Sequence, residues 1–118
     1  MELQLDSKKL DILAKAVEDA GLYAKERQRE IHRAYKTDGS VITETDLSIS
    51  KRILSVVSSL FPEANIISEE TLTTFSLEAP YTFVLDPIDG TDVYSQGLPS
   101  WAVALGVLDK DRKPVGAY

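Results

Sequence analysis

Apolar residues recur every three or four positions along the first 35 residues, with Lys, Glu and Arg between them. This period matches one face of an α-helix. The residues of that face are Leu10, Leu13, Ala14, Val17, Ala24 and Ile31. The pattern predicts one long amphipathic helix from Asp6 or Ser7 to about Tyr35, with a weak point at Gly21.

A second helix is predicted after a short polar stretch. Residues 36–43 contain an Asp-Gly pair, which is typical of a tight turn, between two segments that can pair as a hairpin. Helical spacing of apolar residues then returns from Leu47 to Phe61, and Pro62 ends it. The hydroxyl of Thr43 stands where a helix-capping side chain is expected.

The rest of the chain contains short runs of β-branched, aromatic and small residues. Residues 65–68 and 81–85 are predicted as buried strands, residues 101–108 as a third strand and residues 114–118 as the start of a fourth. Residues 109–113 form a polar turn between the last two. The order of elements predicts an α+β fold in which two N-terminal helices precede mainly antiparallel strands.

Composition narrows the kinds of partner. The formal net charge is −6, which argues against a surface that binds a nucleic acid polymer. The N-terminus lacks a basic start, and no uncharged run approaches the roughly 20 residues that span a bilayer, so we expect a cytoplasmic protein without a membrane partner. Because the chain has no cysteine, a bound metal would be held mainly by oxygen atoms.

The segment with the strongest chemical signal is residues 86–91, with the sequence DPIDGT, directly after the predicted strand 81–85. Its two carboxylates are three residues apart, Pro87 restricts the turn, and Gly90 permits tight backbone geometry. Such an oxygen cluster suits a hard divalent cation. A short helix beginning at Gly90 or Thr91 would add backbone N–H groups for an anion. An Asp-Gly hairpin turn capped by Asp86 is the simpler alternative.

Two further groups of polar residues have simple structural interpretations when each is taken alone. Glu69 and Glu70 follow the predicted strand 65–68 and suit a solvated acidic loop. Residues 36–38, Thr43 and Asp46 suit a turn followed by a helix cap. Their combination with residues 86–91 favours a shared site.

Together these segments resemble the inositol monophosphatase family, which lies within the wider lithium-sensitive, Mg-dependent phosphatases. Residues 86–91 resemble its first signature, residues 68–70 its acidic pair, and residues 36–46 its element with Lys, Asp, Val-Thr and Asp. The three motifs occur in the family's order. The resemblance implies a layered helix/sheet sandwich of the sugar-phosphatase type and Mg²⁺-dependent hydrolysis of a small phosphomonoester, such as inositol monophosphate or a related sugar phosphate.

The resemblance also assigns metal ligands. Glu69, Asp86 and the main-chain carbonyl of Ile88 would bind a first Mg²⁺, and Asp86 and Asp89 a second. Two such cations can orient a water and stabilise the leaving oxygen during in-line displacement. Glu69 therefore counts among the catalytic residues as well as the ligands.

The remaining roles implied by the resemblance concern the phosphate and the attacking water. Thr91 would connect to Asp46 by hydrogen bonds and help to activate the water, and the N–H groups of Gly90 and Thr91 would hold phosphate oxygens. Glu70 and Lys36 would lie in the outer shell of the site. The family's later Trp-Asp signature is missing, so residues 1–118 are expected to be the N-terminal metal-binding part of a longer domain.

Several alternatives stay open on the sequence. The substrate can instead be a 3′(2′),5′-bisphosphate nucleotide. Residues 92–94 match the usual sequence of neither the inositol monophosphatases nor the bisphosphate nucleotidases, so they do not decide between the two substrates. The chain can also be a non-catalytic metal-binding fragment, or an interaction module whose last strand pairs with another chain. A homodimer is expected only by analogy with the family.

Overall fold

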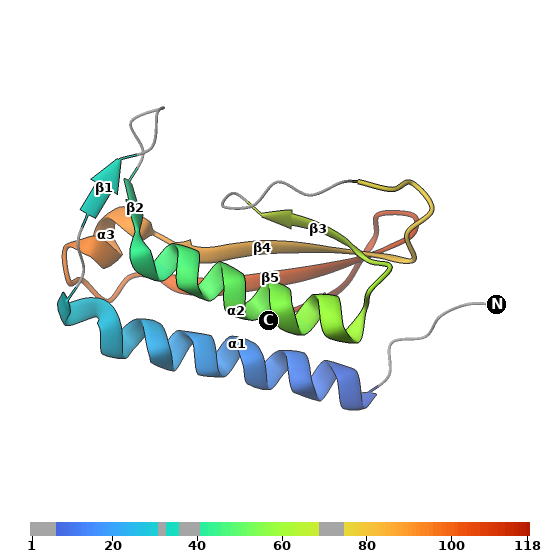
Figure 1. Cartoon of the computed structure of the whole chain (residues 1–118), viewed down its shortest axis with the longest axis horizontal. Coiled ribbons are helices and arrows are strands. Elements are labelled where there is room, and N and C mark those ends of the chain that lie inside the picture. The colour runs from blue at the N-terminus through green and yellow to red at the C-terminus, as the bar shows by residue number, and fades with distance from the viewer. Residues whose placement is uncertain (1–6, 31–32, 36–40, 69–74) are drawn as a thin grey trace.

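The computed structural model describes residues 7–30, 33–35, 41–68 and 75–118. For residues 33–35 and 41–42 it describes the backbone only. Two helices lie side by side along one face of a four-stranded sheet, and a two-stranded hairpin stands at one end (Figure 1). The predicted α+β class is confirmed. No helix among the described residues is long and apolar enough to cross a membrane.

The first helix is shorter than its predicted extent. Helix α1 spans Ser7–Arg27, continues unbroken through Gly21, and is followed by the 3₁₀ turn η1 at Gln28–Glu30 and strand β1 at Arg33–Tyr35. Its buried residues are Leu13, Ala20 and Ala24. The next positions on that face are the polar Arg27 and Gln28, which interrupt the apolar stripe that a longer helix would have to bury.

The predicted second helix is confirmed, and the predicted hairpin is present, with its first strand earlier than expected, inside the stretch predicted as helix. Strand β1 pairs antiparallel with β2 (Val41–Thr43), and the turn between them lies outside the described residues. Helix α2 spans Glu44–Leu60 and begins with a capping box at Thr43. At its end the Phe61 N–H donates to the Val57 carbonyl at 2.7 Å, and Pro62 follows.

The main sheet is mixed. Its strands are β3 (Asn65–Ser68), β4 (Tyr81–Asp89), β5 (Ala102–Asp109) and β6 (Pro114–Ala117), in the spatial order β3-β4-β5-β6. The β4–β5 and β5–β6 pairs are antiparallel, as expected, whereas β3 runs parallel to β4. A parallel pair needs a long crossover rather than a tight turn, and residues 69–80 provide that length.

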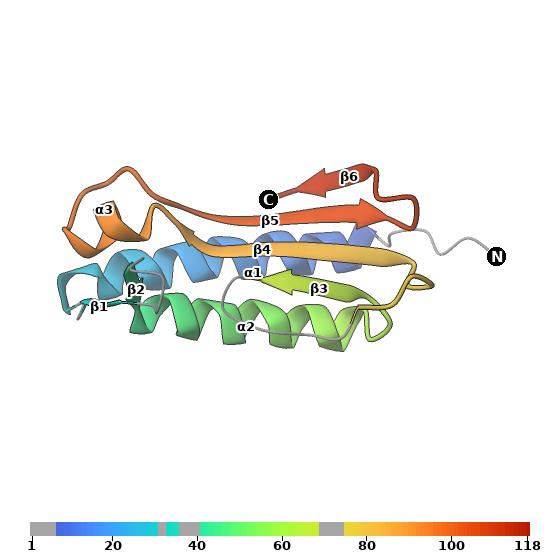
Figure 2. The same cartoon turned by 90° about the horizontal axis from the view of Figure 1, so that it is seen from above.

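One face of this sheet packs on the helices, as Figure 2 shows from above. The core joins α1, α2, β4 and β5 through side chains that are almost wholly buried, among them Leu13, Ile53, Val57, Phe83 and Val107. This packing fixes α2 and β4 relative to each other, because interiors are close-packed and tolerate little displacement.

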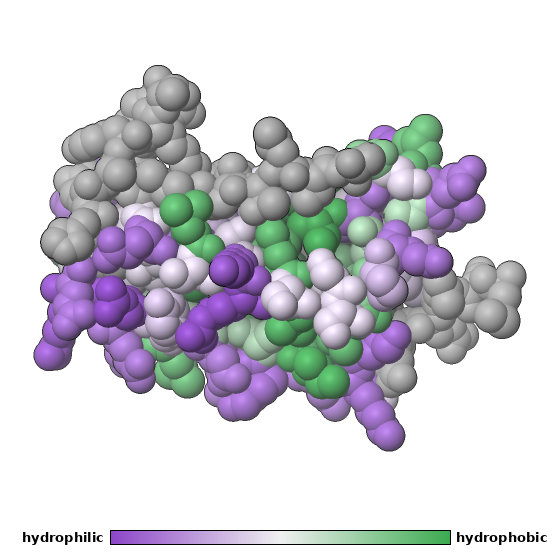
Figure 3. Space-filling model, in the orientation of Figure 1, coloured by the Kyte–Doolittle hydropathy of each residue, from purple (hydrophilic) through white to green (hydrophobic). Residues whose placement is uncertain are grey.

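The opposite face of the sheet is less covered. Ile67 and Val84 are register partners on β3 and β4, and their side chains are 46% and 39% exposed. Figure 3 shows apolar surface gathered where β3 lies in Figure 1. The strands at residues 65–68 and 81–85 were predicted to be buried, and that prediction is wrong for Ile67 and Val84, because both side chains lie on the sheet face opposite the helices.

Candidate functional site

The site residues that the structure describes come from the start of α2, the end of β4 and the start of α3 (Thr91–Ser95), which meet at the end of the molecule where the hairpin stands. Strand β4 ends there and leads through Gly90 into the short helix α3. Helix α2 begins at the same end, and α3 packs against β2, which immediately precedes α2 (Figure 1). The start of α2 and the end of β4 therefore face each other.

The carboxyl end of β4 differs from the predicted turn. The strand continues through Asp89, with Asp86 opposite Ala104 and Asp89 opposite Ala102. Three steps on β4 thus match two on β5, which is a β-bulge. Pro87 cannot donate a ladder hydrogen bond, and a bulge is one of the few places in a sheet that accepts such a residue. Asp86 is half-buried with its Oδ1 atom shielded from solvent, whereas Asp89 is exposed.

Gly90 makes the sharp transition from strand to helix. Its φ of 88° lies in the left-handed region that favours glycine. A Cβ at this position would lie 3.0 Å from the Ser100 carbonyl oxygen and 3.2 Å from the Val93 side chain. The predicted short helix is confirmed as α3, which begins at Thr91. Glycine is therefore required here both for the backbone angle and for space.

Thr91 connects the two elements. Its hydroxyl lies 2.9 Å from Asp46 Oδ1 and also 2.9 Å from the main-chain carbonyl oxygen of Ile88. One hydroxyl has one proton, so it donates to one of these acceptors at a time. Asp46 is 1% exposed at the start of α2, and Ile88 is buried on β4. The hydroxyl therefore lies between a buried carboxylate and the backbone at the end of β4.

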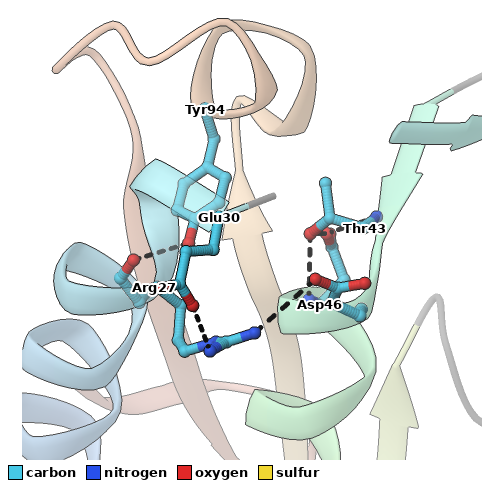
Figure 4. A network of polar contacts seen from close by, with 7 residues as sticks. Arg27, Glu30, Thr43, Asp46 and Tyr94 are labelled. Atoms are coloured by element: carbon cyan, nitrogen blue, oxygen red, sulfur yellow. Dashed lines mark hydrogen bonds and ion pairs between the residues drawn. The ribbon is translucent and has the colours of Figure 1, made fainter. Parts of the chain in front are cut away.

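The Asp46 carboxylate is held from its other side by Thr43. The Thr43 N–H donates to Asp46 Oδ2 at 2.9 Å, and the Thr43 hydroxyl donates to the same oxygen at 2.5 Å. Figure 4 shows the two side chains facing each other at the start of α2. Asp46 is thus part of the helix cap and also accepts a hydrogen bond from Thr91. The capping role and the predicted contact with Thr91 are therefore compatible.

The structure brings together six of the predicted site residues and leaves three outside its description. The six are Asp46, Asp86, Ile88, Asp89, Gly90 and Thr91. The predicted ligand Glu69 and the predicted outer residues Glu70 and Lys36 lie outside the described residues. Among the residues that are described, no three Asp, Glu or His side chains come together as a ready metal site. The roles of all nine stay predictions.

Contacts that hold α3 in place were not foreseen. The Gln28 side-chain amide donates to the carbonyl oxygens of Tyr94 and Leu98 at 3.1 and 2.9 Å, and the Tyr94 hydroxyl donates to the Ala24 carbonyl oxygen at 2.5 Å. Figure 4 shows Tyr94 reaching from α3 to α1. These partners are far apart in sequence, so no local pattern could have indicated them. They fix α3, and with it Thr91, against the end of α1.

The Tyr94 side chain is fully buried. Its ring packs edge-to-face on Trp101 with centroids 4.9 Å apart. Burial is the main reason that the pKa of Tyr94 is raised above the usual value for a phenol, and the nearby Asp46 carboxylate raises it further. The phenol therefore stays protonated and keeps its hydrogen bond to α1.

An ion pair between Arg27 on α1 and Glu44 on α2 also links the two helices near the site. The Arg27 guanidinium lies 2.8 Å from a Glu30 carboxylate oxygen (Figure 4) and 3.7 Å from a Glu44 carboxylate oxygen. These side chains are between about a third and three quarters exposed, so solvent screens the attraction strongly. We assign these contacts a minor role beside the buried hydrogen bonds.

Comparison with known proteins agrees with the motifs. The model of the inositol monophosphatase family matches residues 6–118. The Nus factor SuhB of Haemophilus influenzae is 32% identical over 110 residues, which cover 91% of this chain and 41% of that protein. The inositol-1-monophosphatase of Synechocystis is 30% identical over 106 residues, covering 89% and 36% of the two chains.

A solved structure of an IMPase/NADP phosphatase complexed with Mg²⁺ and phosphate superimposes with a TM-score of 0.81 at 18% identity, covering 95% of this chain and 43% of that one. The chain spans about two fifths of the length of the curated relatives it matches. The likeness in fold and the match of the family model over nearly the whole chain lead to one conclusion. This chain belongs to the inositol monophosphatase family.

Proposed function

We propose that this chain supplies the metal-binding part of an enzyme that hydrolyses a small phosphomonoester, inositol monophosphate or a related sugar phosphate, with Mg²⁺ as cofactor. The observation that carries the proposal is the position of the Thr91 hydroxyl, 2.9 Å from a buried carboxylate and next to the strand end that carries Asp86 and Asp89. The relatives' greater length supports a longer parent protein, in which residues 1–118 form the N-terminal part.

The donor groups at the end of β4 fit the proposed cation. Two carboxylates and one main-chain carbonyl offer only hard oxygen atoms, which Mg²⁺ prefers. The Ile88 carbonyl has two lone pairs, so a hydrogen bond from Thr91 leaves one for a ligand bond. Asp86, Asp89 and Ile88 would hold the cation together with Glu69. When bound, Mg²⁺ supplies the positive charge that neutralises the phosphate and activates water.

Thr91 and Asp46 would handle the proton of the attacking water. While the Thr91 hydroxyl donates to the Asp46 carboxylate, its lone pairs are directed elsewhere and can accept a hydrogen bond from water. Asp46 then takes the proton that passes through Thr91, as a general base. Burial of Asp46 keeps bulk water from competing for this hydrogen bond. The backbone N–H groups of Gly90 and Thr91 would hold phosphate oxygens.

Lys36 and Glu70 would lie in the outer shell of the metal site. The positive charge of Lys36 would screen the negative charge of the carboxylates there. A homodimer rests on the family resemblance alone, and a cytoplasmic location rests on the N-terminal sequence and the lack of a long uncharged run; both stay predictions. The relative named Nus factor SuhB favours a second candidate, in which the same fold binds a partner without hydrolysis. The two candidates differ in whether Mg²⁺-dependent turnover occurs.

The test is phosphate release from inositol monophosphate and from adenosine 3′,5′-bisphosphate, with this chain and with its longest natural extension. Asp86→Asn removes a negative charge while nearly preserving shape, so Mg²⁺-dependent hydrolysis should fall by more than about 100-fold. The matched control is Asp111→Asn, at an exposed carboxylate in the turn between β5 and β6. Wild-type turnover by Asp86→Asn would contradict the metal assignment, and silence of every form would favour the binding role.

A further inference from the structure

The hydrogen bonds around Asp46 go beyond those of an ordinary helix cap. In a capping box, the cap hydroxyl mainly accepts the N–H of the third helical residue. Here that contact, from the Asp46 N–H to the Thr43 hydroxyl, is long at 3.3 Å, whereas the hydroxyl and Asp46 Oδ2 are 2.5 Å apart. Because an ionised carboxylate can only accept, the hydroxyl is the donor in this contact, and hydrogen bonds to an ionised acceptor are the stronger kind.

This contact determines which way the carboxylate faces. Two donors of one residue, the Thr43 N–H and hydroxyl, hold Oδ2. The other oxygen, Oδ1, is thereby left facing the Thr91 hydroxyl at 2.9 Å. Thr43 is 2% exposed, so water does not replace its hydroxyl. Rotation of the carboxylate would break two hydrogen bonds that the buried surroundings cannot replace.

The orientation matters because Thr91 has a second acceptor. The Ile88 carbonyl oxygen lies at the same 2.9 Å from the Thr91 hydroxyl as Asp46 Oδ1 does. If the carboxylate turned away, the hydroxyl proton would go to Ile88. Thr91 would then no longer be connected to the buried base. A fixed Asp46 therefore keeps the proton path from Thr91 to the carboxylate in place.

We propose that Thr43 is a positioning residue for the reaction, whose hydroxyl holds Asp46 so that Oδ1 receives the Thr91 proton. This inference rests on the proposed phosphatase function. It predicts that loss of the Thr43 hydroxyl slows the chemical step and leaves substrate binding nearly unchanged, because the hydroxyl is directed at Asp46.

The test uses the full-length enzyme with Thr43→Val, which removes the hydroxyl and keeps the β-branched shape and the backbone N–H. We expect kcat to fall by about 10-fold or more, within the range of general acid–base effects, with KM changed less than about two-fold. Thr43→Ser, which restores the hydroxyl, should recover most of the lost kcat. Ile53→Val, a core change in the same helix, controls for lowered stability and should retain kcat.

A double variant distinguishes positioning from capping. Because Thr43 acts through Asp46 on Thr91, adding Thr43→Val to Thr91→Val should lower kcat little further. Additive losses, or an unchanged kcat in Thr43→Val together with lower stability, would overturn the inference and leave Thr43 as a cap. Absence of Mg²⁺-dependent hydrolysis in the wild-type enzyme would overturn the proposed function and this inference with it, so the two failures are distinguishable.

Discussion

Gly90 and Gly97 both have left-handed backbone angles, with φ of 88° and 80°, but their surroundings differ. A Cβ at Gly90 would come within 3.0 Å of the Ser100 carbonyl oxygen, while a Cβ at Gly97 would meet nothing within 4 Å. Backbone atoms cannot move aside as the end of a flexible side chain can. The two positions therefore separate the cost of the backbone angle from the cost of crowding.

We expect Gly97→Ala to destabilise the chain by about 1 kcal/mol, because alanine is strained in this region of backbone angles. Gly90→Ala should cost more, roughly 2–4 kcal/mol, because crowding against Ser100 adds to that strain. Gly21→Ala is the matched control. Gly21 lies inside α1 with open space around it, so alanine should stabilise the chain by about 0.5–1 kcal/mol.

Urea unfolding of the three variants checks this order. The slope of the unfolding free energy with denaturant should stay the same, so that changes in midpoint report stability alone. Equal losses for Gly90→Ala and Gly97→Ala would show that the contact with Ser100 is not tight in solution.

At the scale of single residues, sequence patterns found much of the site but not its internal contacts. Spacing placed Thr43 and Asp46 at a helix start, and residues 86–91 after a strand, because both signals are local. The contact between the Thr91 hydroxyl and the Ile88 carbonyl oxygen depends on the direction of that carbonyl within the β-bulge. That direction is set by pairing with β5, which no local spacing reveals.

The connection of α1 to α3 through Tyr94 is the clearest contact between elements that the sequence did not suggest. The Tyr94 hydroxyl donates to the Ala24 carbonyl oxygen, and its ring is fully buried. Burial raises the pKa of Tyr94, so the folded state binds the phenolic proton more tightly than the unfolded state. The resulting stabilisation is fully present below the unfolded pKa near 10 and is lost as the pH rises through the higher folded value.

Tyr94→Phe should lower the unfolding free energy by about 1 kcal/mol at neutral pH, because one buried hydrogen bond is lost. The difference between wild type and variant should stay constant up to about pH 10 and shrink above it, since only the wild type loses the phenolic proton. Chemical unfolding at a series of pH values measures this. A difference that stays constant across the alkaline range would show that Tyr94 titrates alike in the folded and unfolded states.

Element boundaries show the same division between local and distant causes. The start of α2 was predicted correctly because its cap is local. The end of α1 was misplaced by about eight residues, since apolar Ile31 continued the helical spacing although Arg27 and Gln28 interrupt the buried face. Gln28 instead donates a hydrogen bond to the Tyr94 carbonyl oxygen of α3, and the residues after it form β1, which pairs with β2. Tertiary partners thus outweighed helical periodicity in this segment.

At the scale of the whole molecule, order and type of nearly all elements followed from the sequence, whereas the arrangement of the sheet did not. The parallel pairing of β3 with β4 depends on a crossover whose path the pattern of residues does not encode locally. The same pairing is what brings the end of β3, just before Glu69, alongside β4, with Ser68 opposite Leu85. The predicted ligands Glu69 and Asp86 each follow directly after one of these two partners.

A metal site at this end of the sheet predicts a dependence of thermal stability on Mg²⁺. The chain carries a net charge of −6, and a cation held by Asp86 and Asp89 binds only the folded state. At about ten times the dissociation constant, Mg²⁺ should stabilise the fold by about 1.4 kcal/mol and raise Tm by roughly 5 °C. Calorimetry at constant ionic strength measures this rise, and EDTA should reverse it. Asp111→Asn should keep the rise and Asp86→Asn should lose it, because only Asp86 lies at the end of β4; equal rises in both variants would mean that Mg²⁺ acts by general screening.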